Sequence, residues 1–384
     1  MDCSNKSKLL VVDDSAFMRK LISDFFVGNP KIEVVGTARN GKEAIQKIQQ
    51  LKPNVVTMDV EMPEMNGLDA LKEIMEICPV PVVMLSSTTK RGTENTLAAM
   101  EYGAVDFVAK PSGTISLDLH KIRDELVYKV EQAAQVSVSK LKQQAEEICV
   151  ENKQSPTYTN TQKPVRQTKL LINKQVESSE LFTKQAKREW SKTSKKVVLI
   201  GTSTGGPRAL QEVITKIPAN IQAPILIVQH MPAGFTKSLA TRLDQLSNIK
   251  VKEAEQGDIL QNGVAYIAPG GYHLKLRKVG MSFGIALDQT EPPRSGHRPS
   301  VDVMFEEVSK YDDFDKIAVI MTGMGYDGSN GLIALKQTGN VMAIAESANT
   351  CIVYGMPKAA VETQLVDEVA DVDNIAQSIM KYML

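Results

Sequence analysis

Short apolar runs alternate with stretches of helical periodicity in the first third of the chain. The runs are five or six residues long, are rich in valine, isoleucine and leucine, and lie at 8–12, 31–36, 54–58, 80–85 and 105–109. A continuous apolar run is typical of a strand buried on both faces, as in a parallel sheet covered by helices. The pattern predicts a first α/β domain, residues 1–128, built on a five-stranded parallel sheet.

The same alternation returns in the second half of the chain. The predicted strands there lie at 196–200, 224–228, 264–268, 317–321 and 341–345, with helical stretches between them. These runs predict a second domain, residues 195–384, with a doubly wound and mostly parallel α/β fold.

The segment between the two domains, residues 129–194, has a different composition. From Leu126 to Lys195 there are thirteen Lys or Arg, seven Asp or Glu, nine Gln and no Gly. Its apolar residues are too sparse to offset the entropy of ordering the chain, so we interpret it as a linker. Its basic character would also suit nucleic acid, but a solvated tether is the preferred interpretation. Helical spacing from Asp118 to about Ala145 predicts that the first domain's last helix extends into this segment.

Charge and cysteine content narrow the class of protein. The chain has 45 Lys or Arg and 45 Asp or Glu, so nothing in its overall charge favours nucleic acid as a partner. No apolar run approaches the roughly 18 residues that a bilayer span requires, so we expect no membrane insertion. The cysteines form no CxxC pair, which indicates a reducing compartment and a cytoplasmic protein; they are Cys3, Cys78, Cys149 and Cys351.

Polar residues follow the predicted strands of the first domain. Asp13 and Asp14 come after the first strand, Asp59 after the third, Ser86 after the fourth and Lys110 after the fifth. The carboxyl ends of parallel strands meet at one edge of a sheet, where ligands bind. Converging carboxylates suit a hard cation such as Mg²⁺, and the ammonium and hydroxyl groups suit a phosphoryl group. A carboxylate in this setting can act as a nucleophile toward phosphate.

The first domain resembles the receiver domain of two-component response regulators. The likeness lies in LLVVDDSAFMRKLI, TMDVEMPEMNGLDAL and DFVAKP. It implies a flavodoxin-like fold and a histidine kinase as phosphodonor. It also implies a role for each strand-end residue: Asp59 is the phosphoacceptor, Asp13 and Asp14 help it hold Mg²⁺, Ser86 (or its neighbour Ser87) senses the phosphoryl group, Lys110 pairs with it, and Phe107 is the switch aromatic.

The second domain begins with a strand, the turn GTSTGGP (201–207) and a helix. A dinucleotide fingerprint would need a glycine where Ser203 stands and an acidic residue after the next strand, and neither is present. The run instead fits G-x-S-x-G, a sharp strand-to-helix turn that lifts a serine above the sheet. This turn favours Ser203 as a nucleophile.

A nucleophilic serine needs a base, and the chain has four histidines. His230 follows the next predicted strand and should lie on the same rim of the sheet as Ser203. Asp327, in the glycine-rich loop TGMGYDGSNG, is expected to orient the imidazole, although capping a helix is its alternative role. The other histidines have simpler interpretations: a surface position for His120, a structural one for His273, and a substrate contact for His297.

Five motifs of this domain resemble those of the chemotaxis protein-glutamate methylesterase family, in which a receiver is fused to a serine esterase. They are GTSTGGP, VQHMP, APGGYHL, SGHRPSVDVMF and TGMGYDG, in the family's order. The resemblance implies a catalytic triad of Ser203, His230 and Asp327. It also implies that backbone N–H groups hold the oxyanion, with Met324 as a contributor, and the elbow geometry separately nominates the N–H of Thr204.

The resemblance implies that the protein hydrolyses glutamate methyl esters on methylated chemoreceptors, with methanol as the leaving group. The same attack on a glutamine side chain would release ammonia, so deamidation is expected as a second activity. Ester hydrolysis by a serine needs no cofactor, so Mg²⁺ belongs to the receiver alone. His297 and Arg298 are candidate substrate contacts. Since a regulated output needs an off state, we expect the unphosphorylated receiver to cover the rim with Ser203.

Two other classes of protein fit the sequence less well. A transcriptional regulator would carry a small helical output with a basic recognition helix, and the second domain has neither feature. A nucleotide-binding α/β domain would use GTSTGGP to cradle phosphate, but the turn lacks the lysine of a P-loop.

Overall fold

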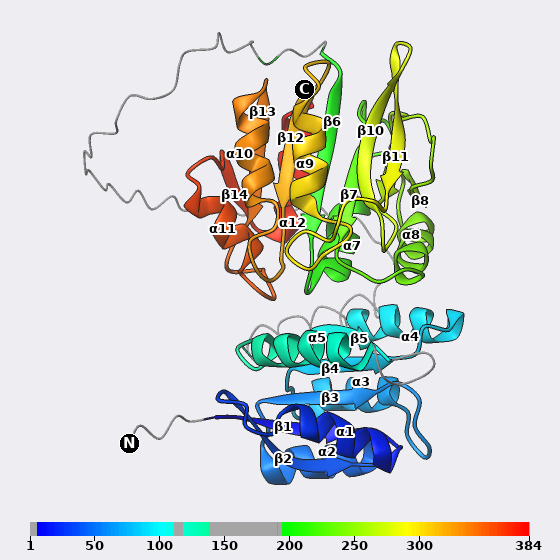
Figure 1. Ribbon diagram of the computed structural model, residues 1–384, viewed down its shortest axis with the longest axis vertical. Helices are drawn as coiled ribbons and strands as arrows, with labels where there is room; N and C mark the ends of the chain where they lie inside the picture. The colour runs from blue at the N-terminus through cyan, green and yellow to red at the C-terminus, as the bar shows by residue number, and fades with distance from the viewer. Residues whose placement is uncertain (1–5, 111–117, 138–189, 191–193, 384) are drawn as a thin grey trace, which may run out of the picture.

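The structure is a computed structural model that describes residues 6–110, 118–137, 190 and 194–383 (Figure 1). The first unit is a five-stranded parallel sheet, as predicted, and its strands lie in the order β2-β1-β3-β4-β5. Its strands are β1 (Ser7–Val12), β2 (Ile32–Ala38), β3 (Val55–Asp59), β4 (Val82–Ser86) and β5 (Asp106–Ala109). Its helices are α1 (Ala16–Phe25), α2 (Gly41–Leu51), α3 (Gly67–Ile77), α4 (Lys90–Glu101) and α5 (Asp118–Ala133).

Short polar side chains start most of these helices. Ser15, Asn40, Asn66 and Thr89 each accept a hydrogen bond from a backbone N–H in the first turn of α1, α2, α3 and α4. Such caps satisfy donors that have no partner within the helix. They fix where each helix begins, so that the cap at Ser15 ends the loop that carries Asp13 and Asp14.

The second unit is a parallel seven-stranded sheet in the order β14-β13-β12-β6-β7-β9-β8. A separate antiparallel hairpin joins β10 (His273–Val279) to β11 (Ser282–Asp288). The sheet strands are β6 (Lys196–Thr202), β7 (Ile225–Gln229), β8 (Lys250–Glu253), β9 (Val264–Ile267), β12 (Asp315–Ile320), β13 (Val341–Glu346) and β14 (Glu368–Ala370). The helices are α7 (Gly206–Ile214), α8 (Phe235–Leu246), α9 (Val301–Ser309), α10 (Ser329–Gln337), α11 (Met356–Glu362) and α12 (Val372–Lys381).

The sequence pattern predicted the central strands of this sheet and missed the two outermost ones. β8 and β14 are edge strands of four and three residues. Both are partly exposed along their length, so neither carries the continuous apolar run that marks a strand buried on both faces. The fold class is nonetheless the doubly wound α/β fold that the sequence predicted.

The strand order reverses direction beside β6. From β6 the chain proceeds through β7, β8 and β9 on one side, then crosses to β12, β13 and β14 on the other. Such a switch point opens a crevice at the carboxyl ends of the neighbouring strands, where ligands bind in open α/β sheets. The loops after β6, β7 and β12 meet there.

The last helix of the first unit is shorter than predicted. The α5 helix ends at Ala133 and a turn follows, whereas helical spacing had suggested an end near Ala145. Most of the predicted linker, 138–189, lies outside the described residues, so the boundaries at 128 and 194 stay predictions. In the part of the chain that the structure describes, no helix is both long and apolar enough to cross a membrane.

Candidate active site

A sharp turn follows β6 and carries Ser203. Gly205 has a φ of 76°, a conformation that suits glycine, and it precedes the first residue of α7. The N–H of Ser203 donates to the carbonyl of Thr322 at 3.0 Å, and the N–H of Gly206 donates back to the carbonyl of Ser203 at 2.8 Å. Hydrogen bonds therefore hold the turn together and connect it to the loop after β12.

Gln229, which sequence reasoning did not single out, clamps this turn to the next strand. Its Oε1 accepts from the hydroxyl of Thr202 at 2.6 Å, and its Nε2 donates to the carbonyl of Ser203 at 2.9 Å. A side chain at Gly206 would not fit, because a Cβ atom there would lie 1.9 Å from the same Oε1. Buried amides need their hydrogen bonds, so this clamp is rigid. The sequence signal that could have identified Gln229 was its position directly before His230.

His230 and Asp327 form a buried hydrogen-bonded pair. Nε2 of His230 donates to Oδ2 of Asp327 at 2.8 Å, and the two side chains are 4% and 2% exposed. Because the carboxylate accepts, Nε2 carries the proton of the neutral imidazole and Nδ1 holds the free lone pair. Nδ1 is buried and has no hydrogen-bond partner among the described residues. It is the ring nitrogen available for proton transfer.

Three further donors reach the carboxylate of Asp327. The hydroxyl of Ser300 and the N–H of Asp302 donate to Oδ1 at 2.8 and 2.9 Å, and the N–H of Val301 donates to Oδ2 at 2.7 Å. Burial alone would raise the pKa of Asp327, but the hydrogen bond and charge of His230, with these N–H groups, hold the pKa below its usual value. The carboxylate therefore stays ionised and can stabilise an imidazolium.

The two candidate substrate contacts lie in different settings. His297 stacks on His230, with ring centroids 3.8 Å apart and planes inclined by 8°. Arg298 instead turns back on its own loop, where its guanidinium donates to the carbonyls of Gln289 at 2.7 Å and Glu291 at 3.2 Å. The structure thus brings His297, but not the Arg298 guanidinium, into contact with the His230–Asp327 pair.

The two oxyanion candidates lie on loops that flank Ser203. Thr204 follows Ser203, and its carbonyl accepts from the hydroxyl of Thr322 at 3.0 Å. Met324 lies in the loop after β12, which approaches closely, since a Cβ atom on Gly323 would lie 2.8 Å from Cβ of Ser203. Both Thr204 and Met324 are buried.

An acidic cluster stands at the carboxyl edge of the first sheet. Oxygens of Asp13, Asp14 and Asp59 lie within 4.8 Å of one another. Nζ of Lys110 is 2.8 Å from an oxygen of Asp13 and 2.8 Å from one of Asp59. Burial raises the pKa of Asp59 to about 6, although Lys110 opposes the shift. Oxygen-only ligands at this spacing fit a hard divalent cation, which would relieve the repulsion among the carboxylates.

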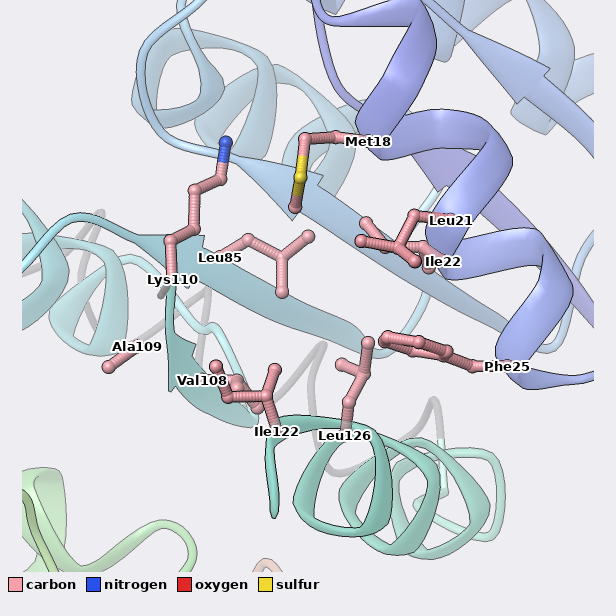
Figure 2. A pocket seen from close by; sticks show the side chains of 10 residues that line it. All are labelled: Met18, Leu21, Ile22, Phe25, Leu85, Val108, Ala109, Lys110, Ile122 and Leu126. Carbon is pink, nitrogen blue, oxygen red and sulfur yellow. The ribbon is translucent and has the colours of Figure 1, made fainter. Parts of the chain in front are cut away.

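Ser86 and Lys110 stand at the ends of β4 and β5, the two strands that follow β3 in the sheet. The hydroxyl of Ser86 is buried and donates to the carbonyl of Gly92 at 3.0 Å. The stem of Lys110 borders an apolar pocket between α1 and α5, while its ammonium group points away from the pocket (Figure 2). Met18 and Ile122 face each other across this pocket. The stem of Lys110 thus packs against apolar side chains, while its charged ammonium group lies at the carboxylates of Asp13 and Asp59.

The receiver-like unit rests on the rim that carries Ser203. Its α4–β5–α5 side faces α7 and α8 (Figure 1). The ring of Phe107, in β5, stacks on Phe235 of α8 with centroids 4.6 Å apart. The hydroxyl of Thr204 donates to the buried carboxylate of Asp106, and Lys129 lies 3.2 Å from the same carboxylate. A receiver residue therefore bonds directly to the neighbour of Ser203.

Comparisons with known proteins cover almost the whole chain. Residues 198–379 match the family model described as CheB methylesterase, and residues 9–120 match the response regulator receiver domain. Relatives named protein-glutamate methylesterase/protein-glutamine glutaminase are 52% identical in Geobacillus kaustophilus and 51% in Halalkalibacterium halodurans. These matches cover 97% and 98% of this chain and 98% of each relative. The crystal structure of the Thermotoga maritima CheB methylesterase catalytic domain is 43% identical; the match covers 49% of this chain and 99% of that one, at a TM-score of 0.47.

Proposed function

The chain belongs to the protein-glutamate methylesterase/protein-glutamine glutaminase family, with a receiver domain and a CheB methylesterase domain, and we propose that Ser203, His230 and Asp327 are its catalytic triad. The observation that carries this proposal is the buried His230–Asp327 pair, 2.8 Å apart, on the rim that bears Ser203. The substrates are glutamate methyl esters of methylated chemoreceptors.

The reaction begins when Nδ1 of His230 takes the hydroxyl proton of Ser203 as its oxygen attacks the ester carbonyl. Asp327 stabilises the imidazolium that forms. The N–H groups of Thr204 and Met324 hold the oxyanion. The imidazolium returns the proton to the departing methanol, and water, activated in the same way, frees the glutamate. A glutamine side chain reacts by the same steps with ammonia as the leaving group.

The receiver regulates this reaction through Asp59, the proposed phosphoacceptor. A histidine kinase is the phosphodonor, and Asp13, Asp14 and Asp59 would hold the Mg²⁺ ion that neutralises the incoming phosphoryl group. Ser86 and Lys110 contact that group once it is bound. Phe107 is the switch aromatic, and its stacking on Phe235 supports a direct link from the phosphorylation site to the interface.

The unphosphorylated receiver occludes the esterase in this proposal. The hydrogen bond from Thr204 to Asp106 supports it, because Thr204 also supplies an oxyanion N–H. Lys129 forms an ion pair with the same Asp106 carboxylate; burial opposes the charged form of Lys129, but Asp106 and Glu125 outweigh burial and raise its pKa. A truncated protein, residues 194–384, should be more active than the unphosphorylated full chain. We also propose a cytoplasmic location and domain boundaries at residues 128 and 194.

The test is methanol release from methyl-labelled chemoreceptor membranes, with and without a small phosphodonor. Wild type should release methanol and do so faster with the donor. Ser203→Ala should release none, whereas the matched control Ser247→Ala, which removes another partly buried hydroxyl of the same domain, should behave as wild type. Release that survives Ser203→Ala would contradict the triad. Binding of phosphate analogues without any ester hydrolysis would favour a nucleotide-binding domain instead.

A further inference from the structure

His297 lies against the ring of His230 but takes no part in the mechanism above. The two imidazoles are parallel within 8°, with centroids 3.8 Å apart, so they are in van der Waals contact over their faces. They come from distant parts of the chain: His230 follows β7, and His297 lies in the loop between β11 and α9. The contact therefore exists only because the fold brings two loops together.

The loop that carries His297 is held in a defined position. Arg294 and His297 exchange two backbone hydrogen bonds of 3.0 and 2.9 Å across a two-residue turn. The turn residues, Ser295 and Gly296, have φ values of 51° and 83°, as tight hairpin turns require. Arg294 also forms an ion pair with Glu291 at 2.8 Å. The His297 ring is thus presented by a braced turn and not by a free loop.

The stacked ring of His297 fixes the plane of the His230 ring, which the hydrogen bond to Asp327 alone does not. The terminal torsion of a histidine turns the ring about the Cβ–Cγ bond and is broad, so a single hydrogen bond holds the ring plane of His230 only loosely. A parallel ring at 3.8 Å blocks this rotation, because any tilt would press ring atoms together. The direction of Nδ1 is then fixed. A misplacement of about 1 Å in a catalytic group can cost roughly 10²-fold in rate.

The charge of the stack also suits a base. Burial, with the charges of His230 and Lys129, lowers the pKa of His297 to about 3, and Asp327 only partly opposes this. Near neutral pH the stack therefore carries a single positive charge, on His230, when the proton of Ser203 arrives. A second imidazolium 3.8 Å away would repel it.

We propose that His297 is a positioning residue of the esterase, whose ring, stacked on His230, holds the imidazole plane so that Nδ1 faces Ser203. This inference rests on the proposed roles of Ser203 and His230. It assigns His297 to the base and not to the substrate.

The test compares His297→Phe, which keeps a flat ring without ionisable nitrogens, with His297→Leu, which keeps apolar bulk without a flat face. Methanol release from methyl-labelled chemoreceptor membranes is measured on the full chain with a phosphodonor present. We expect His297→Phe to keep kcat within about threefold of wild type. We expect His297→Leu to lower kcat by about 10- to 100-fold with KM unchanged. Urea unfolding of each variant checks that the fold is intact.

Other results would overturn the inference. An increase in KM with kcat unchanged in both variants would make His297 a substrate contact. Equal losses of kcat in both would show that its nitrogens matter and not its flat face, and no loss in either would remove any role. Activity that survives Ser203→Ala or His230→Ala would instead refute the proposed triad, which is a separate failure.

A measurement on the unmodified protein covers the case in which a variant fails to fold. Titration of the imidazole signals by nuclear magnetic resonance should show His297 still neutral at pH 5.5, where a histidine with the ordinary pKa of about 6.5 would be protonated. A His297 that becomes protonated above pH 5.5 would overturn the inference.

Discussion

Asp327 and Asp302 cap each other's helices. Asp327, just before α10, accepts the N–H groups of Val301 and Asp302 at the start of α9. Asp302, in α9, accepts the N–H groups of Gly328 and Gly331 at the start of α10, at 2.8 and 2.7 Å. Carboxylates at helix N-termini satisfy free donors and complement the helix dipole. Asp327 can thus serve as a helix cap and as the partner of His230 at once.

The two carboxylates should respond differently to conversion to the amide. Asp302 uses Oδ1 for both backbone donors, so Asp302→Asn keeps that acceptor and should cost about 1 kcal/mol in unfolding free energy. Asp327 uses both oxygens, so Asp327→Asn sets an NH₂ group against the backbone N–H of Val301 or that of Asp302. We expect a cost of about 2–3 kcal/mol and a fall in kcat of roughly 10³–10⁴, because the tautomer of His230 is lost.

Urea unfolding and methanol release by the same two variants check this prediction. Equal stabilities of the two variants would contradict the predicted difference in capping. A wild-type kcat in Asp327→Asn would show that capping is the whole function of Asp327.

The ion pair between Glu101 and Arg242 should help to hold the receiver on the esterase. Arg242 donates to both carboxylate oxygens of Glu101, at 2.8 and 3.1 Å, across the interface. Both groups are partly exposed, so the pair contributes about 1 kcal/mol or less. Glu101→Arg should raise methanol release by the unphosphorylated full chain severalfold. The double exchange with Arg242→Glu should restore the low rate, and a double variant as active as Glu101→Arg would argue against the pair.

Gly67 should tolerate no side chain, because it lies against the strand end that carries Asp59. A Cβ atom there would be 2.0 Å from the carbonyl oxygen of Asp59, and backbone cannot move aside as a side chain can. We expect Gly67→Ala to destabilise the receiver by about 1–3 kcal/mol and to reduce phosphorylation of Asp59 by a small phosphodonor.

Gly36→Ala is the matched control for this substitution. A Cβ atom there meets only the methyl ends of Leu51 and Leu10, at 2.8 and 3.5 Å, which can rotate away. Gly36→Ala should phosphorylate as wild type does. Equal effects of the two substitutions would mean that the close contact with the Asp59 carbonyl is not the reason why position 67 requires glycine.

His273 should make stability fall with acid. It is fully buried, its Nε2 donates to the carbonyl of Pro292, and burial lowers its pKa. The unfolded chain binds a proton near pH 6.5 that the folded chain does not, so stability declines as pH drops below that value. At pH 5.5 the loss reaches up to about 1.4 kcal/mol.

The variant His273→Gln retains a donor for Pro292 and has no proton to take up. The pH dependence of urea unfolding between pH 7.5 and 5.5 should therefore be flatter in this variant by up to about 1.4 kcal/mol. Parallel curves for the variant and wild type would contradict the assignment.

The sequence by itself determined the fold class and the edge of each sheet at which the candidate site residues gather. Strands buried on both faces need continuous apolar runs, and such runs can be recognised in the sequence alone. Because parallel strands end at one edge, residues directly after them, such as Asp59, Ser203 and His230, are predicted to gather there without any coordinates. The strands β8 and β14 escaped because they are short and partly exposed and therefore carry no such run.

Only the tertiary structure decided what these residues touch. The stacking of His297 on His230, the clamp of Gln229 on Ser203 and the bond from Thr204 to Asp106 each join segments at least 26 residues apart. No local period or spacing encodes such contacts, because they depend on how loops from different strands pack together after the sheet has formed. The strand pattern determined which edge carries the chemistry, and packing across that edge decided the partner of each group.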